Sequence, residues 1–192
     1  MTIGTIINSA SIGDSSSFVV IDQLVGGLQG LPESPKNAGR LTLIVRRGED
    51  GARETPERVE VTPEGGIPGD SWGRRGDKDP EKQIAVMESA VASMIANGQP
   101  LTLFGDGLFL DLDLSKENLP EGSRLQIGTA VLVVTPHPHN GCKKFLSRFG
   151  SDALRFVSTT EIRHRNLRGI YLRVVEGGTI ATGDAITVVE RP

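Results

Sequence analysis

Short runs of β-branched and aliphatic residues, separated by turns, recur along most of this chain. The 192 residues include 24 glycines and 11 prolines, and these two residue types end strands and shape turns. Runs of strand-forming residues lie at residues 2–8, 18–25, 41–46, 58–62, 83–87, 108–114, 124–127, 130–135, 170–175 and 185–189. The pattern therefore predicts one mainly β domain that covers residues 1–192.

Only two segments predict helices. Residues 88–96 read as a short helix that stops at Asn97-Gly98. Residues 142–157 carry apolar side chains at steps of three and four, with a break expected at Gly150-Ser151. Between the elements we expect a charged surface loop at 47–55 and a turn-rich loop at 65–82. Because structureless loops of that length are often functional, residues 65–82 are a candidate part of a site.

Composition limits where the protein works and what it contacts. Hydrophobic residues make up 37% of the chain and charged residues 23%, as in an ordinary water-soluble domain. No apolar run approaches the roughly 18 residues of a membrane span, and the first ten residues lack the features of a signal peptide. We therefore expect a cytoplasmic protein with no membrane contact.

Cys142 is the single cysteine of the chain, so it cannot form an internal disulfide. The segment TPHPHNGCKKF at 135–145 joins a predicted strand to the predicted helix, which places the thiol near a helix start. The helix dipole, together with Lys143 and Lys144, favours the thiolate, the form that attacks electrophiles and binds metals. The alternative is an inert, buried cysteine that packs as a small apolar residue.

Basic residues gather in the same part of the sequence. The stretch 143–173 has a net charge of +6, although the whole chain has −3 and the remainder therefore −9. Its cations are Lys143, Lys144, Arg148, Arg155, Arg163, Arg165, Arg168 and Arg173. Such a region implies an anionic partner. Aromatic residues make up only 4% of the chain and do not alternate with the basic ones, so a small phosphorylated ligand fits better than nucleic acid.

Two histidines precede the cysteine, in the spacing H-x-H-x-x-C. His137, His139 and Cys142 have the chemistry of zinc ligands. However, alternate residues of an extended chain face opposite ways and no fourth ligand is evident, which argues against zinc. Instead, His139 can orient the loop or act as a proton donor near the thiol.

Three stretches carry a family resemblance: TPEGGIPGDSWG at 62–73, NLPEGSRLQIGTAVLVVTPHPHNGCKKF at 118–145 and LRGIYLRVVEGGTIATGDAITV at 167–188. By these the chain resembles the MOSC domain, named after the C-terminal domain of molybdenum-cofactor sulfurase, most strongly over 62–190. The resemblance implies a closed, mostly antiparallel β-barrel similar to that of pyruvate kinase, with a few short helices.

The resemblance also implies a function. MOSC proteins are associated with molybdenum cofactor (molybdopterin) and with sulfur transfer, and the family is also associated with pyridoxal phosphate. Cys142 matches the family's cysteine, which implies that it either ligates molybdenum or carries a persulfide. Implied partners are sulfur donor or acceptor proteins. Reduction of N-hydroxylated compounds would add a redox partner.

Further site residues follow from the same match. Gly69-Asp70 corresponds to the family's Gly-Asp pair and Arg168-Gly169 to its Arg-Gly pair. We therefore expect Asp70, Asn140, Lys143 and Arg168 to bind cofactor, with Lys143 and Arg168 on a pterin phosphate. Turn chemistry and surface charge are the alternative roles of these residues. In that case the protein is a non-catalytic anion-binding or zinc-binding barrel.

Overall fold

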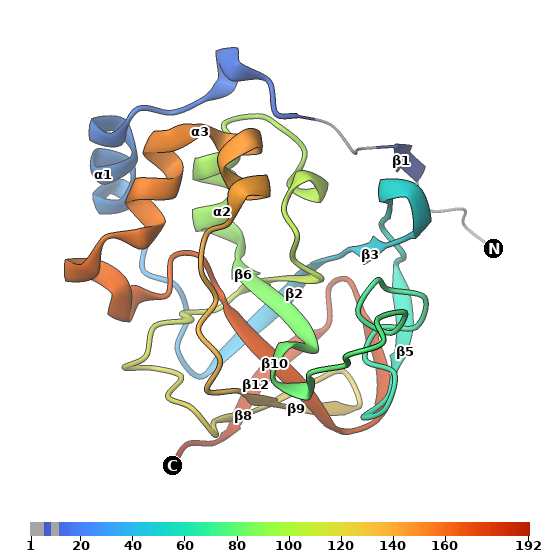
Figure 1. Cartoon of the computed structure of the whole chain (residues 1–192). Helices are drawn as coiled ribbons and strands as arrows, with labels where there is room; N and C mark the ends of the chain where they lie inside the picture. Colours follow the sequence, from blue (N-terminus) through green and yellow to red (C-terminus); the bar gives the residue numbers. More distant parts are fainter. Residues whose placement is uncertain (1–5, 9–11) are drawn as a thin grey trace.

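Seven strands form a closed barrel in the computed structural model, which describes residues 6–8 and 12–192 (Figure 1). Around the barrel the strands are β10 (Ile170–Glu176), β6 (Ile84–Glu88), β7 (Leu108–Asp111), β2 (Ala38–Ile44), β12 (Ala185–Glu190), β8 (Arg124–Ile127) and β9 (Ala130–Val134). All neighbouring pairs are antiparallel except β6 and β7. The closed barrel predicted from the sequence is confirmed.

The alternation of side chains along the strands explains the barrel interior. In β8 the side chains alternate between exposed and buried, and in β9 between buried and half-buried. The inward residues, among them Leu41, Val86, Leu125 and Leu172, form one fully enclosed apolar cluster. Burial of this cluster is the main force that closes the barrel.

Two small sheets flank the barrel. One contains β1 (Ile6–Asn8), β4 (Ala52–Glu54) and β3 (Arg46–Arg47), and the other pairs β11 (Gly178–Ala181) with β5 (Arg58–Val61). The prediction of a surface loop at 47–55 is therefore wrong. The stretch forms a β3–β4 hairpin, and the charged pattern concealed it because Arg53 is one of its buried side chains. Of the strand predicted at 2–8, residues 2–5 lie outside the described residues.

Three helices lie together on one side of the barrel (Figure 1): α1 (Ile21–Gly30), α2 (Ser89–Ala96) and α3 (Lys143–Ser158). They enclose a second core against the outer faces of β6 and β7, which includes Met87, Phe104, Phe109 and Phe149. Short 3-10 helices lie at Ser15–Ser17, Glu49–Gly51, Pro80–Lys82, Leu101–Leu103 and Thr160–Arg165. Among the described residues, no helix has the length and apolar character needed to cross a bilayer.

Helix α1 corrects the strand predicted at 18–25. Its residues Ile21, Leu24 and Leu28 recur at helical spacing and pack into the second core. The Asp152 carboxylate of α3 accepts a hydrogen bond from the Ile21 backbone N–H at 3.0 Å, which satisfies a free donor at the helix start. Tertiary packing thus overrides the strand preference of the β-branched residues.

Helix α3 follows the prediction closely. It begins at Lys143, directly after Cys142, and Gly150 interrupts it with φ 87°. This left-handed conformation favours glycine. A side chain there would also lie within 2.7 Å of the Phe18 ring. The break lets Phe145 and Phe149 on one side of it and Phe156 on the other all enter the second core.

Candidate functional site

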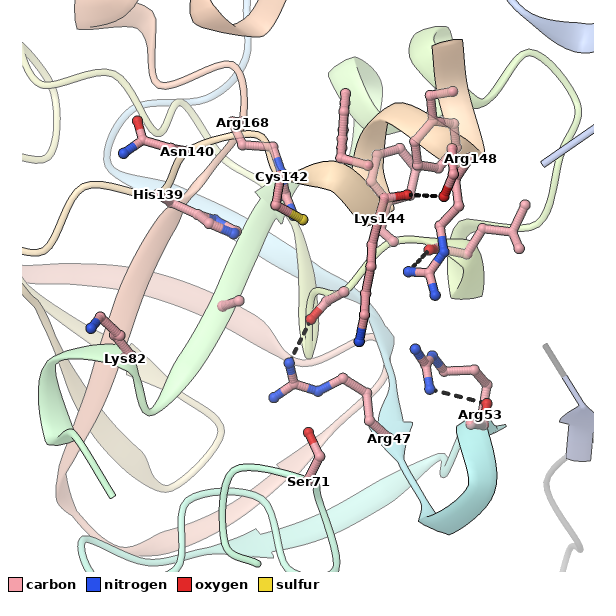
Figure 2. Close-up of a pocket in the computed structure, with 18 of the residues that line it drawn as sticks. Arg47, Arg53, Ser71, Lys82, His139, Asn140, Cys142, Lys144, Arg148 and Arg168 are labelled. Carbon is pink, nitrogen blue, oxygen red and sulfur yellow. Dashed lines mark hydrogen bonds between the residues drawn. The ribbon is translucent and has the colours of Figure 1, made fainter. Parts of the chain in front are cut away.

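A pocket of about 560 Å³ lies between the β3–β4 hairpin, the loop before α3 and the first turns of α3 (Figure 2). Basic side chains dominate its lining: Arg47, Arg53, Arg75, Lys82, Lys144, Arg148 and Arg168. Of the residues that the structure describes, no aspartate or glutamate lines it. The predicted functional loop 65–82 contributes Ser71 along with Arg75 and Lys82. The charged side chains of the described lining are thus all basic, which gives the pocket a positive potential.

Cys142 lines this pocket as the residue that precedes α3. Its backbone is extended, and its carbonyl accepts the first-turn hydrogen bond from the Leu146 N–H at 3.0 Å. The free thiol is exposed and makes no capping hydrogen bond. The predicted position at the helix start is confirmed, and the alternative of a buried cysteine is wrong.

His139 lies in the pocket with a side chain that is only 6% exposed. Its ring packs on Tyr171, with 4.5 Å between ring centres. Burial, and next the charges of Arg168 and Arg47, hold the pKa of His139 well below its usual value. The imidazole is therefore neutral near pH 7, and its 3.6 Å approach to Asp106 is not an ion pair. This favours the orienting role over that of an imidazolium acid.

Arg168 is held by Asp106, a residue that the sequence did not indicate. Its Nη1 donates to both carboxylate oxygens, at 3.0 and 2.8 Å, and Asp106 is fully buried. Burial raises the pKa of Asp106 although the charge of Arg168 opposes this. The Arg168 guanidinium also lies 5.1 Å from the centre of the Phe145 ring, while its buried Nε has no hydrogen-bond partner. Arg168 is thus fixed through Nη1 and keeps an unpaired donor at Nε.

Asp70 lies behind the pocket lining, where it binds Arg47. Its carboxylate accepts hydrogen bonds from Nε and Nη2 of Arg47, at 2.9 and 2.6 Å, and from the backbone N–H groups of Arg47 and Trp72, both at 2.9 Å. Burial alone raises the pKa of Asp70, but the bonds and charge of Arg47 more than offset this, so the pKa is lowered. Asp70 does not line the pocket itself and instead positions Arg47, which does.

The remaining predicted residues separate into two groups. Asn140 is exposed and lines the pocket, as expected of a polar anchor. Lys143 is also exposed but is not among the lining residues, and its neighbour Lys144 takes that place. Sequence reasoning also missed Arg53, which only the hairpin brings to the pocket.

The zinc arrangement considered as an alternative for His137, His139 and Cys142 is not formed in the described part of the chain. Within residues 6–8 and 12–192, no three His, Cys, Asp or Glu side chains are grouped so as to hold a metal ion. His137 lies instead against Tyr171, with 5.7 Å between ring centres. Besides the thiol and neutral polar groups such as Asn140 and His139, the pocket is lined by seven cationic side chains, which suit an anionic ligand better than a bare cation.

Comparison with known proteins agrees with this architecture. A family model described as the MOSC domain matches residues 78–187. No curated protein matches the sequence. Among solved structures, the chain is similar to the YuaD protein from Bacillus subtilis, with TM-score 0.59 and 19% identity over 78% of this chain and 94% of that one. It is also similar to YiiM from Escherichia coli, with TM-score 0.53 and 18% identity over 80% and 71% of the two chains.

Proposed function

Because this chain belongs to the MOSC domain family, we propose that its pocket binds molybdenum cofactor and that Cys142 provides a thiolate ligand to the metal. The observation that carries the proposal is the pairing of an exposed thiol with a pocket lined by seven basic residues. Molybdenum cofactor is a pterin that carries a phosphate, so a cationic pocket matches its charge. A thiolate is the form of cysteine that binds metals.

The residues present fit this group in three respects. A volume of about 560 Å³ lies within the usual range for small-ligand pockets, roughly 300–1,000 Å³. The buried Nε of Arg168 lacks a protein partner and can donate to a ligand. Asn140 adds an exposed amide at the rim, where it can bond a polar edge of the ligand.

Each residue then has a defined task. Cys142 would hold the metal, while Arg47 and Arg168 compensate negative charge from positions that Asp70 and Asp106 fix. Neutral His139 orients the loop that ends at Cys142. When bound, the cofactor would supply oxygen-atom transfer, and the substrate class we propose is N-hydroxylated compounds, with electrons from a redox partner.

Sulfur carriage is the second candidate function, and the exposure of Cys142 favours it. A persulfide carrier needs a thiol that donor and acceptor proteins can reach, and it needs no enclosed cofactor. The surrounding cations would stabilise the persulfide anion in the same way as the thiolate. Both functions depend on the sulfur atom of Cys142. An experiment can distinguish them by identifying whether that atom carries the cofactor metal or an additional sulfur atom.

Native mass spectrometry tests both functions. The protein is purified without reductant from a host that makes molybdenum cofactor, together with Cys142→Ser and with Ser158→Ala, an exposed serine at the far end of α3. We expect a molybdenum-pterin adduct on the wild type and on Ser158→Ala but not on Cys142→Ser. Added sulfur in multiples of one atom, dependent on Cys142, would instead identify the carrier. The same adducts on Cys142→Ser, or no adduct on any variant, would contradict both.

A further inference from the structure

Arg53 and Arg148 approach the pocket from elements far apart in the sequence. Arg53 belongs to β4 and Arg148 to α3, and each residue is only 8% exposed. Figure 2 shows Arg148 and Lys144 extending from α3 toward Arg53 on the hairpin. We call Arg53, Lys144 and Arg148 the three-cation cluster.

Most donors of the two arginines are not used by the protein. Nη1 of Arg53 donates to the carbonyls of Gly51 and Ala52, both at 3.1 Å, and Nη1 of Arg148 donates to the Leu103 carbonyl at 2.7 Å. Nε of Arg53 is buried without a hydrogen-bond partner. Among the described residues, neither arginine forms a salt bridge with a carboxylate.

The surroundings of Arg53 and Arg148 disfavour the charged forms of both side chains. Burial first, and then the charges of Arg148 and Arg47, lower the pKa of Arg53. Burial is also the main cause that lowers the pKa of Arg148; the charge of Cys142 opposes this and that of Arg168 adds to it. Buried cations of this kind are normally paired, because an isolated charge loses its hydration without compensation. Within the described residues, only the Cys142 sulfur and the more distant Asp70 offset these charges, and no carboxylate bonds to either arginine, so an anionic ligand can supply the remaining counter-charge.

We propose that the three-cation cluster is a binding site for a doubly charged oxyanion of the phosphate class. Two guanidinium groups and one ammonium group offer several N–H donors, and the planar fork of arginine suits paired bonds to phosphate oxygens. Such an anion bridges the β3–β4 hairpin and α3, the helix that Cys142 precedes. The site binds phosphate whether it is free or part of a larger ligand, so it does not depend on the molybdenum proposal.

Isothermal calorimetry with inorganic phosphate tests the site, with chloride at matched ionic strength as the reference. Arg53→Gln and Arg148→Gln should each weaken phosphate binding about tenfold or more, the loss expected for one charge-assisted hydrogen bond. Arg155→Gln is the matched control, since Arg155 is an exposed cation of the same helix, paired with Asp152. It should bind phosphate like the wild type.

Two further variants keep the test decisive. Lys144→Gln changes an exposed side chain and should also weaken phosphate binding, even if a buried variant fails to fold. Cys142→Ser removes a competing negative charge near Arg148 and should therefore bind phosphate at least as tightly as the wild type, which separates this site from the proposed metal ligand. If the wild type binds phosphate no better than Arg53→Gln and Lys144→Gln do, the proposal is wrong.

A last comparison identifies the source of the phosphate. Protein that carries a phosphorylated ligand in the pocket should lose its affinity for inorganic phosphate if the ligand's own phosphate occupies the cluster. Full affinity in the loaded protein would instead assign the cluster to free phosphate. Both results presuppose that the three-cation cluster binds phosphate in the unloaded protein. If the unloaded protein does not bind phosphate, the proposed site is wrong.

Discussion

Two groups of arginines share one pocket but are held in opposite ways. Arg47 and Arg168 each bind a buried carboxylate, Asp70 or Asp106, whereas Arg53 and Arg148 bind only backbone carbonyls. Asp70 raises the pKa of Arg47 despite its burial, while the pKa of Arg53 is lowered. The protein itself therefore fixes the position of the paired arginines and neutralises part of their charge, whereas most donors of the unpaired arginines remain free for a ligand.

The largest effect should come from breaking the deepest pair. Arg168→Met leaves the Asp106 carboxylate buried without its cation, which should lower the free energy of unfolding by roughly 3–5 kcal/mol at neutral pH. Denaturant unfolding measures this loss. The matched control is Arg173→Met, an exposed arginine of β10, the strand that follows Arg168, which should change stability by less than about 0.5 kcal/mol.

The pH dependence of that loss gives a check on its cause. Burial already raises the pKa of Asp106, and removal of Arg168 removes the charge that opposes this rise. When the pKa of a carboxyl group is raised in the folded state, the folded protein is most stable with that group protonated. Its free energy of unfolding therefore decreases as the pH rises toward the raised pKa. Arg168→Met should therefore lose more stability at pH 8 than at pH 5. An equal loss at both would contradict the role assigned to Asp106.

Asp70→Asn should have the next largest effect. It removes the counter-charge of Arg47 and weakens the bonds to two backbone N–H groups, which should cost about 2–3 kcal/mol in unfolding free energy. The comparison is Asp77→Asn, an exposed aspartate of the same loop, with little expected change. An Asp70→Asn protein as stable as Asp77→Asn would show that Arg47 needs no fixed partner.

Acid unfolding sharpens the same contrast. Although burial opposes this, the hydrogen bonds and charge of Arg47 lower the pKa of Asp70 in the folded state below its ordinary value of 3.8. Its contribution is therefore present above that value and is lost as the pH falls through the lowered pKa. Between neutral pH and about pH 3, the wild type should lose stability more steeply than Asp70→Asn does. Parallel pH profiles for the two proteins would contradict this.

Arg53→Gln should have the smallest effect on stability when no oxyanion is present. The substitution removes a buried like charge as well as two hydrogen bonds to carbonyls, and these changes offset one another. We expect an unfolding free energy within about 1 kcal/mol of the wild type in chloride buffer. A loss as large as that of Arg168→Met would mean that Arg53 is a framework residue after all.

The parts of this molecule that the sequence predicts depend on local pattern. Alternating strands, the helix after Cys142 and its break at Gly150 each follow from neighbouring residues. Asp106 could not be found in this way, because Gly105-Asp106-Gly107 reads as a turn and its partner Arg168 lies 62 residues away. Arg53 could not be found either, because it lies within a charged stretch of sequence and is buried only in the folded β3–β4 hairpin. The two ion pairs that position arginines of the pocket join residues far apart in the sequence. Of the four residues in these pairs, the family resemblance indicated Asp70 and Arg168 but not Arg47 or Asp106.

The central claim is that a reactive thiol and an anion-attracting pocket are one site. Alkylation of Cys142 by iodoacetate, which is anionic, and by iodoacetamide, which is neutral, tests this most directly, with glutathione as the free-thiol reference. The basic lining should raise the rate ratio of iodoacetate to iodoacetamide above that of glutathione. Added salt should lower the ratio, and so should Lys144→Gln. A ratio equal to that of glutathione, unchanged by salt and by Lys144→Gln, would contradict the account.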